Sequence, residues 1–510
     1  MSDGAAKEAR PLAIQTAIGA LWLLVWRLLS RSLGLVSTLV LARVLVPADF
    51  GLIAMATTFA GAVDALSQLG LQDALVRHVG DSRRLFNTAF TLQVCRGALT
   101  ALVVAGASPL AAEWFNEPRL IPVLLVLAVS SLAAGFENIG IAEFRQQMRY
   151  DRQVRLLFLP RLLQVCCTIS AALLLQSYWA LLIGIVVGQL GRVAMTYVAH
   201  PFRPRFGLAE WRELAGFSLW TWASWVASLV WDRIDPFVLG PTVGSTKLGL
   251  YLLGAELAML PLSELVAPVA DALFAAFAAA QKDGSSSVHH APSVATMLVL
   301  VVMPMAVTLS YGADFVIEAL LGPKWHEAAP IVAAMAWLCV ASPISFVCNA
   351  VLVANGRVRR SFTGRLTASI VKTVAFVAVL SVTRRLDVVA IAMTICVFLE
   401  CCAFTLLLRG LLKESLRPHV AAFVRILLAG VLAMLVLQQS GSGWQNEPIS
   451  ALRAALVCIE IALLALTIYI PLISGLWVIA GRPAGPETRA LEMMRHYGGL
   501  LRVRLSASGP

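Results

Sequence analysis

The chain has 510 residues, of which 59% are hydrophobic and 14% are charged. Its mean hydropathy is +0.81, whereas a soluble domain carries about 25% charged residues to cover its surface. This composition excludes a soluble enzyme, a disordered scaffold and a secreted disulfide protein, and it leaves a polytopic membrane protein.

The charges that are present lean basic, with 40 Lys and Arg against 29 Asp and Glu and a net charge of +11. In a membrane protein this excess collects in cytoplasmic loops, so we expect no nucleic-acid partner. The nine cysteines all fall in apolar segments, and no Cys-x-x-C pair occurs. Neither a metal site nor a disulfide framework is therefore expected. No nucleotide-binding G-x-x-x-x-G-K-[ST] loop occurs either, and the sequence indicates no cofactor.

Long apolar segments divide the chain at regular intervals. A helix needs roughly 20 mostly apolar residues to cross the hydrocarbon, and these segments are too long and too uniformly apolar for barrel strands. We therefore predict an all-α membrane protein with about 14 transmembrane helices. The predicted helices start near Ile14, Phe50, Leu85, Pro122, Val154, Tyr178, Leu214, Leu248, Val294, Ile331, Gly364, Val388, Ala421 and Ala451.

The orientation follows from the positions of Lys and Arg between these segments. With the N-terminus in the cytoplasm, 26 of them fall on the cytoplasmic side and 8 on the opposite side. Basic residues prefer cytoplasmic loops, so both termini are predicted to be cytoplasmic.

An internal repeat predicts how the helices are grouped. A shift of 198 residues aligns Phe50-Gly51-Leu52 with Leu248-Gly249-Leu250, and Asp73-Ala74-Leu75 with Asp271-Ala272-Leu273. The shift covers six predicted helices, an even number, so the copies form a parallel, pseudo-twofold repeat of two six-helix lobes. The predicted parts are a cytoplasmic N-terminus (1–13), a first lobe (14–199), a cytoplasmic linker (200–213), a second lobe (214–410), an added helix pair (421–478) and a cytoplasmic tail (479–510).

Two shorter patterns refine this plan. Residues 200–205 read HPFRPR, and their prolines and arginines predict an extended cytoplasmic segment between the lobes. Gly184 and Gly188 form a G-x-x-x-G pattern, which predicts a surface for close packing between helices.

Six cations fall inside predicted spans: Arg27, Arg31, Arg96, Arg161, Arg192 and Lys372. An arginine near the bilayer centre costs about 2.5–3.5 kcal/mol on insertion scales, so such side chains normally face a cavity or a partner. Arg27 and Arg31 are four residues apart and share one face of the first helix. We favour an anion-binding stripe facing a central cavity, and the alternative is a structural pair with Asp64.

The other cations distribute over both lobes. Arg96 and Lys372 lie mid-way along the third and eleventh helices, one in each lobe, which suits a site at the lobe interface. Structural pairing with Asp64 or Glu400 is the alternative for each. Arg161 either reaches the cavity or extends to the cytoplasm, and we favour the cavity.

The remaining candidates in the predicted spans are one more arginine and three carboxylates. Arg192 lies near a helix end and is predicted to extend to the membrane surface. Asp64, Glu256 and Glu264 are candidates to bind a coupling proton or Na⁺, with a salt-bridge role as the alternative. The interior of the first lobe remains locally positive, which suits phosphate or pyrophosphate.

Several motifs resemble those of Wzx-type polysaccharide flippases, which belong to the multidrug/oligosaccharidyl-lipid/polysaccharide (MOP) exporter superfamily. The first-loop segment LARVLVPADFGL (41–52) resembles the signature of that family. Further matches are GLQDALV (70–76), WFNEP (114–118), RQQMRY (145–150), DPFVLG (235–240) and LGLY (248–251). The resemblance covers residues 12–410, and its strength lies in the order and spacing of the motifs.

The resemblance implies a transporter and not an enzyme. Its activity would be to move undecaprenyl-pyrophosphate-linked oligosaccharide across the bacterial cytoplasmic (inner) membrane by alternating access, for O-antigen, capsule or exopolysaccharide synthesis. Arg27, Arg31 and Arg96 fall where such proteins place cavity cations for the pyrophosphate, and the added helix pair offers a side groove for the lipid tail. The lipid bilayer surrounds the protein, and polysaccharide polymerase and export machinery are candidate partners.

Three other functions are alternatives to this one. A drug/cation antiporter of the same superfamily, similar to the MATE transporters, is the closest, but it would need acidic residues deep in the first lobe, where Asp64 is the only carboxylate. A membrane-bound polymerase or ligase would need a large outer loop, and no predicted loop is long enough. A structural scaffold does not explain the arginines within the spans.

Overall fold

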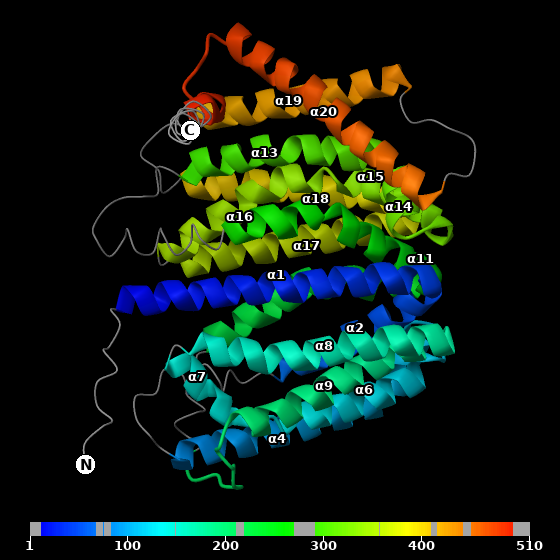
Figure 1. The fold of residues 1–510 in the computed structure, drawn as a ribbon, viewed down its shortest axis with the longest axis vertical. Coiled ribbons are helices and arrows are strands. Elements are labelled where there is room, and N and C mark those ends of the chain that lie inside the picture. The colour runs from blue at the N-terminus through cyan, green and yellow to red at the C-terminus, as the bar shows by residue number, and fades with distance from the viewer. Residues whose placement is uncertain are drawn as a thin grey trace, which may run out of the picture. The chain divides into compact units, whose positions relative to one another are not determined.

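The computed structural model describes residues 12–67, 75, 83–147, 149–210, 219–269, 291–355, 357–409, 416–441 and 450–492. Within these ranges the ordered elements are helices and no strand occurs, which confirms the all-α prediction (Figure 1). The repeat residues 73, 74 and 271–273, the predicted helix start at Leu214, and most of the predicted N-terminus lie outside these ranges, as do residues 211–213 of the linker and 493–510 of the tail.

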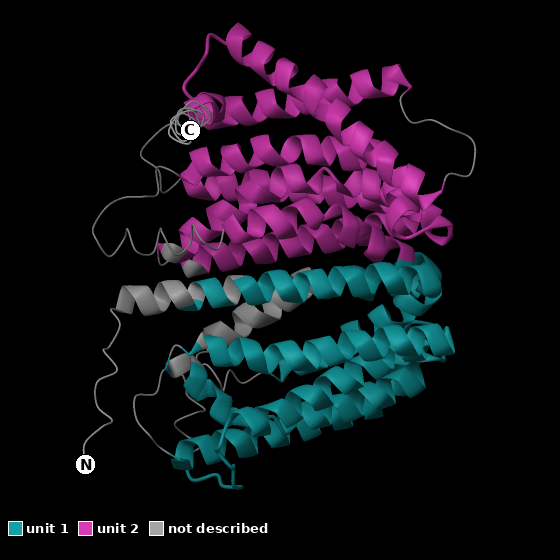
Figure 2. Ribbon diagram, in the orientation of Figure 1, with its two compact units in different colours: residues 1–249 teal, residues 250–510 magenta. Residues whose placement is uncertain are grey.

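The chain divides into two compact units, residues 1–249 and 250–510 (Figure 2). The predicted lobe boundaries remain predictions. Unit 1 contains α1 (Leu12–Val44), α2 (Pro47–Leu66), α4 (Arg83–Gly106), α5 (Ser108–Trp114), α6 (Leu120–Gly135), η1 (Ile139–Ile141), α7 (Ala142–Gln146), α8 (Tyr150–Leu175), α9 (Trp179–Ala199) and most of α11 (Leu219–Ala258).

Unit 2 begins within α11 and is built around a packed apolar core. It continues with η2 (Leu262–Val266), α13 (Ala291–Tyr311), α14 (Ala313–Leu320), η4 (Pro323–Ala328), α15 (Ala329–Met335), α16 (Leu338–Ala354), α17 (Val358–Val382), α18 (Leu386–Arg409), α19 (Arg417–Ser440) and α20 (Ala451–Ile479). One buried apolar cluster of this unit includes Val299, Met303, Ile426 and Tyr469, from α13, α19 and α20. The last two helices therefore pack onto unit 2.

Ten helices in the described part of the chain are long and apolar enough to cross a membrane, or up to twelve if each of two bent pairs is one span. The predicted count of 14 is thus not confirmed. One reason is that α6 has 16 residues, too few to meet the length criterion. Within α11, a kink at the non-helical Gly244 (φ 81°, ψ 172°) separates two helices, and it lies close to the predicted helix start at Leu248.

Local chemistry explains the sharp corner between α1 and α2. Pro47 opens α2 at its first position, where the missing N–H costs no hydrogen bond. Proline also disfavours a helical conformation for the residue before it, and Val46 is extended (φ −107°, ψ 159°). The carboxylate of Asp49 accepts a hydrogen bond from the Val46 N–H at 3.4 Å and so caps the helix.

Two glycines allow α2 and α11 to meet backbone to backbone within unit 1. A Cβ built on Gly51 would lie 1.8 Å from the carbonyl oxygen of Ser245, and one built on Gly249 would lie 1.9 Å from that of Pro47. These glycines are the residues that the repeat aligns with each other. No other residue type fits either position without a shift of the backbone.

The α8–α9 pair confirms the predicted close packing. The two helices run side by side (Figure 1). A Cβ on Gly184 would lie 1.7 Å from Oγ1 of Thr168, and one on Gly188 would lie 3.0 Å from the side-chain amide of Gln164. The glycines of α9 therefore accept polar side chains of α8.

The segment after α9 has no regular secondary structure from residue 200 to 208, and hydrogen bonds join it to α4. The backbone N–H of Arg205 donates to Oδ1 of Asn87 at 2.9 Å, and that of Gly207 donates to Oγ1 of Thr91 at 2.9 Å. The rings of Phe86 and Phe202 pack with centroids 5.7 Å apart. This segment is thus fixed to unit 1.

A polar contact also ties the α5–α6 turn to α11. Oγ of Ser245 donates to Glu117 at 3.1 Å, and Arg119 forms an ion pair with the same carboxylate at 2.7 Å. The hydrogen bond from Arg119 is the main reason that the pKa of Glu117 is lowered from its ordinary value.

The first prediction concerns the glycine crossing. Gly51→Ala should lower the free energy of unfolding by about 1–3 kcal/mol, because the added methyl group overlaps a backbone carbonyl. Gly61→Ala is the matched control on the same helix, since a Cβ at Gly61 meets no atom within 4 Å. Thermal unfolding in detergent measures both. Equal stability of the two variants would contradict a tight crossing.

The second prediction concerns pH. A carboxylate whose pKa is lower in the folded state contributes stability above its unfolded pKa and loses it as the pH falls through the folded pKa. Glu117→Gln should therefore destabilise the protein at neutral pH and leave a smaller loss of stability on acidification than the wild type shows. Melting temperatures between pH 7 and acid pH test this. Parallel curves for variant and wild type would count against it.

Candidate functional site

Arg161 lies near the midpoint of the membrane-spanning segment Asp151–Leu175 of α8. Its Nη1 donates a hydrogen bond to Oε1 of Gln164 at 2.9 Å, one turn further along the same helix. Its Nε is buried and has no hydrogen-bond partner among the described residues. The guanidinium is therefore half-buried at mid-membrane and held by a neutral group.

The guanidinium of Arg161 reaches α1, which packs against α8. A Cβ built on Gly34 would lie 3.1 Å from Nη2 of Arg161, so the missing side chain at Gly34 makes the space that the guanidinium occupies. Gly34 lies near the middle of the spanning segment Val25–Val44. Both ends of this contact are thus at similar depth in their helices.

Arg27 and Arg31 lie on the stripe of α1 that continues to Gly34, because positions separated by four and three residues share a helix face. Arg31 is half-buried and Arg27 is exposed. Arg31 is one turn from Gly34 and hence close to the level of Arg161. The sequence prediction grouped these three arginines in one cavity, and the structure brings Arg161 to the α1 stripe that carries the other two.

Arg96 forms an ion pair with a carboxylate. Its Nη1 lies 3.2 Å from Oδ1 of Asp64, linking α4 to α2, with the arginine side chain 18% exposed and the aspartate side chain 39% exposed. One turn away, the hydroxyls of Ser67 and Thr100 lie 2.9 Å apart. The ion pair between Arg96 and Asp64 is the predicted alternative to a cavity role for Arg96.

Lys372 lies in unit 2, on α17, and is 3% exposed. Its Nζ lies 5.8 Å from the centroid of the Phe376 ring, one turn along the helix. Glu400 on α18 is also buried and is within electrostatic range of Lys372. This burial favours the alternative in which Lys372 pairs with Glu400 over a place on the wall of an open cavity.

The two candidate coupling glutamates sit at the bend between α11 and η2. Glu256 is half-buried in the last turn of α11. Glu264 is half-buried in the π-helical turn η2, where Oγ of Ser263 donates to its Oε1 at 3.0 Å. The helices Arg233–Ala258 and Leu262–Val269, which carry these two glutamates, are bent by 45° relative to each other. π-helical turns often occur at functional sites.

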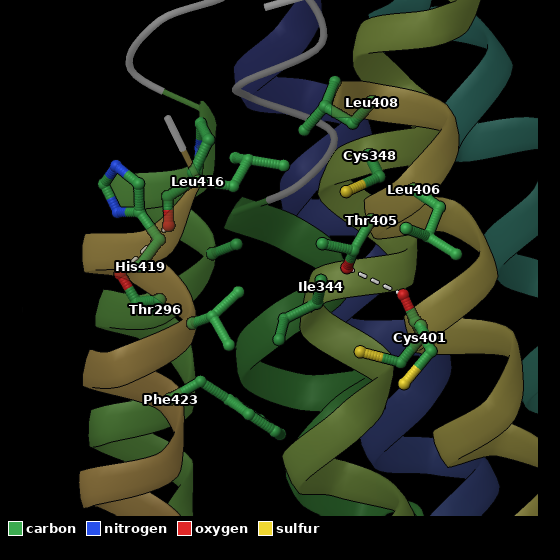
Figure 3. Close-up of a pocket in the computed structure, with 14 residues that line it drawn as sticks. Thr296, Ile344, Cys348, Cys401, Thr405, Leu406, Leu408, Leu416, His419 and Phe423 are labelled. Atoms are coloured by element: carbon green, nitrogen blue, oxygen red, sulfur yellow. Dashed lines mark hydrogen bonds between the residues drawn. The ribbon is translucent and has the colours of Figure 1, made fainter. Parts of the chain in front are cut away.

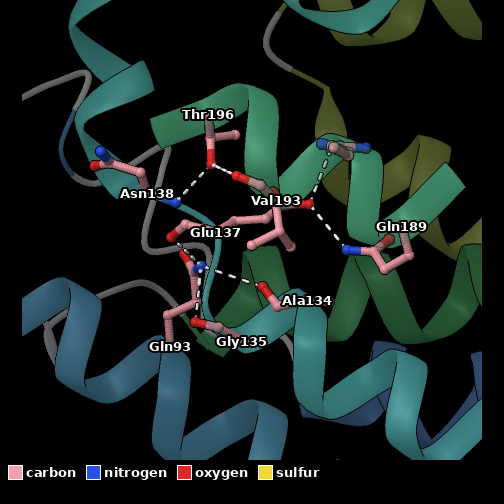
Figure 4. A network of polar contacts seen from close by, with 9 residues as sticks. Gln93, Ala134, Gly135, Glu137, Asn138, Gln189, Val193 and Thr196 are labelled. Carbon is pink, nitrogen blue, oxygen red and sulfur yellow. Dashed lines mark hydrogen bonds and ion pairs between the residues drawn. The ribbon is translucent and has the colours of Figure 1, made fainter. Parts of the chain in front are cut away.

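Sequence reasoning missed a buried polar network around Glu137, shown in Figure 4. Nε of Arg192 lies 2.9 Å from Oε1 of Glu137, and Gln189 donates to the same oxygen at 3.2 Å. The backbone carbonyl of Glu137 accepts a hydrogen bond from Gln93 at 3.0 Å. Arg192, which was predicted to extend to the membrane surface, forms this ion pair with Glu137 while 44% of its side chain stays exposed, so that prediction remains a prediction. The available signal was the spacing of Gln189 and Arg192, which share one face of α9.

An apolar cavity of about 290 Å³ lies in unit 2 between α13, α16, α18 and α19. Figure 3 shows Ile344, Cys348 and Phe423 among the side chains that line it. Its few polar groups are largely satisfied within the protein, since Oγ1 of Thr405 donates to the carbonyl of Cys401 at 2.7 Å. The cavity is suited to hydrocarbon.

Three bacterial biosynthesis proteins are similar in sequence to this chain. Lipopolysaccharide biosynthesis protein WzxC of Escherichia coli (strain K12) is 23% identical over 359 residues, covering 68% of this chain and 72% of that protein. Teichuronic acid biosynthesis protein TuaB of Bacillus subtilis (strain 168) is 22% identical, covering 58% and 62%. Succinoglycan biosynthesis transport protein ExoT of Rhizobium meliloti (strain 1021) is 24% identical, covering 61% and 64%. The chain thus spans somewhat less than two thirds of TuaB and ExoT.

Solved structures share the fold. Lipid II flippase MurJ in an inward closed conformation has a TM-score of 0.68 at 12% identity, covering 89% of this chain and 98% of that chain. An inward-facing multidrug resistance MATE family transporter of the MOP superfamily has a TM-score of 0.58 at 14% identity, covering 77% and 97%. At these identities the likeness concerns the fold alone.

A family profile described as "Polysaccharide biosynthesis protein" matches residues 40–330, which is more than half of the chain. This match and the similarity to WzxC confirm the resemblance that the sequence motifs indicated. The chain is a multi-pass helical membrane protein that belongs to the polysaccharide biosynthesis protein family.

Proposed function

We propose that this protein is a flippase that moves undecaprenyl-pyrophosphate-linked oligosaccharide across the bacterial cytoplasmic membrane by alternating access, with both termini in the cytoplasm. The family match, the similarity to WzxC and ExoT, and the fold shared with MurJ support a transporter and not an enzyme. The observation that carries the proposal is the half-buried guanidinium of Arg161 at mid-membrane, whose hydrogen-bonding partner among the described residues is a neutral amide.

The physical argument is one of charge. Burying an arginine near the centre of a bilayer costs about 2.5–3.5 kcal/mol on insertion scales, and a carboxylate or another anion normally offsets that cost. A pyrophosphate carries at least two negative charges and can bind guanidinium groups through bidentate, charge-assisted hydrogen bonds. Arg161 near mid-span and Arg31 on the α1 stripe provide such groups, and Arg27 lies on the same stripe at the start of the spanning segment Val25–Val44.

The other predicted site residues have different proposed roles. Because Arg96 is paired with Asp64, we propose that Arg96 contributes to the electrostatic potential of the substrate site without binding the substrate directly. A proton or Na⁺ that binds Asp64 would then weaken this ion pair and change that potential. Glu256 and Glu264 are proposed as a second coupling position, beside the bend after α11. Lys372 is the weakest member of the substrate site, because it is almost completely buried in unit 2.

The lipid tail needs an apolar path of its own. We propose that the cavity between α18 and α19 holds part of the undecaprenyl chain while the head group crosses. Because the tail starts in bilayer hydrocarbon, the cavity would keep it in an apolar environment while the head group crosses. Polysaccharide polymerase and export machinery remain proposed partners.

The second candidate function is drug/cation antiport, which the fold shared with a MATE transporter favours. A cation substrate would need an available carboxylate in unit 1. Asp64 is engaged by Arg96, and Glu137 is engaged by Arg192. We therefore rank this function second.

The third prediction tests the cations. Arg31→Ala and Arg161→Ala, and to a similar degree Arg27→Ala, should abolish surface polysaccharide while the protein still inserts, because the pyrophosphate loses its counter-charges. Arg→Lys at these positions should retain part of the activity, since charge remains but the planar fork is lost. Polymer yield is measured at matched membrane expression.

Arg155→Ala is the control for these variants, because Arg155 lies on the same helix as Arg161 in an exposed pair with Asp151. It should leave polymer yield unchanged. Wild-type yield in the Arg31 and Arg161 variants would remove both residues from the site.

The fourth prediction tests the cavity. Cys402→Trp places a large ring where the cavity lies, and it should slow flipping of an undecaprenyl-linked substrate more than that of an analogue with a short prenyl chain. Leu399→Trp is the control, since Leu399 is exposed on the same helix and does not line the cavity. Proteoliposome assays with the two substrates give the comparison. Equal slowing of both substrates would contradict a role in holding the tail.

A further inference from the structure

Three arginines in the spanning helices of unit 1 differ in the kind of side chain that they contact. Arg96 is 3.2 Å from the carboxylate of Asp64, and Arg192 is 2.9 Å from that of Glu137. Arg161 instead donates to the amide oxygen of Gln164 at 2.9 Å. A carboxylate neutralises a guanidinium, whereas an amide holds it in place and leaves its charge intact.

Gln164 has a fixed position because α9 leaves space for it. A Cβ built on Gly188 would lie 3.0 Å from both Cδ and Oε1 of Gln164, so an alanine there would move the amide by a few tenths of an ångström from its present place. The same contact belongs to the tight α8–α9 interface, in which Gly184 accepts Thr168. The amide therefore rests on a closely packed and well-defined surface.

The guanidinium is supported on its other side by α1. Its Nη2 lies over Gly34, and Nη1 is held by Gln164, while Nε has no hydrogen-bond partner among the described residues. A series of contacts thus runs from Gly188 on α9 through Gln164 and Arg161 on α8 to Gly34 on α1. Two glycines at its ends fix a charged group between three helices.

We propose that Gln164 is a positioning residue that holds the guanidinium of Arg161 against α1 without neutralising it, so that the charge is balanced by a diphosphate group of the substrate. This inference rests on the proposed function. It adds that the amide, as opposed to a carboxylate of the same shape, is required at position 164. A residue that served packing alone would allow either group.

The fifth prediction follows from this difference. Gln164→Glu keeps the shape of the side chain but supplies a carboxylate to Arg161, so affinity for inorganic pyrophosphate should fall about tenfold or more. The melting temperature of the free protein should stay equal or rise, because an ion pair replaces a neutral hydrogen bond. Gln164→Met, which lacks the acceptor but adds no charge, should give a smaller loss of affinity. Binding is measured on the full-length protein in detergent by titration with inorganic pyrophosphate.

Three further measurements make the test decisive. Gln176→Glu introduces the same change at the exposed C-terminal end of α8 and should not alter binding. The affinity of Gln164→Glu relative to the wild type should recover as the pH is lowered, because the protonated carboxyl resembles the amide. Flipping of a labelled undecaprenyl-pyrophosphate-linked sugar in proteoliposomes should show a higher KM with a smaller change in kcat.

The outcomes separate the two proposals. If Arg161→Ala abolishes pyrophosphate binding and Gln164→Glu binds as well as the wild type, the role of Gln164 is wrong and the proposed function stands. If Arg161→Ala binds pyrophosphate and flips the labelled lipid like the wild type, the role of Arg161 in the proposed function is wrong, and that of Gln164 with it.

Discussion

The cost of placing a charge in hydrocarbon is the constraint on which the interior of this protein depends. Each guanidinium within a spanning helix needs something to offset that cost, and unit 1 meets the need in two ways. Arg96 and Arg192 have carboxylate partners, which fix helices to one another. Arg161 has an amide partner, which holds the side chain without adding an opposite charge.

Much of the fold could be predicted from the sequence because the bilayer allows few solutions. Apolar runs of sufficient length must form helices, and the helix starts follow from those runs. The number of membrane spans was harder to predict, because it depends both on the length of each helix and on where its backbone is broken. A run such as α6 ends after 16 residues, which is short for a span, whereas the kink of α11 at Gly244 lies close to the predicted helix start at Leu248. Composition measures how apolar a segment is but not where its helix ends.

The charged residues show where prediction from one sequence reaches its limit. The types and depths of Arg96, Arg161 and Arg192 could be read from the sequence, but their partners depend on which helices are neighbours. Glu137 was overlooked because it follows an apolar run and lies 55 residues from Arg192 in the sequence, although the two are 2.9 Å apart in space. Gln164 was overlooked because a neutral amide in a helix carries no signal until its neighbour is known.

The distinction between engaged and available charge also bears on the choice between the two transporter functions. Within the described part of unit 1, Asp64 and Glu137 are each in contact with an arginine, so a cationic substrate that bound at either carboxylate would have to displace that arginine. An anionic substrate would meet Arg161, whose hydrogen-bond acceptor is neutral and can remain in place when the anion binds. An anion that binds Arg161 has no existing ion pair to break, whereas a cation that binds Asp64 or Glu137 has one. By this reasoning the identity of one uncharged residue, Gln164, favours a phosphorylated lipid over a cationic drug more strongly than the shared fold can favour either.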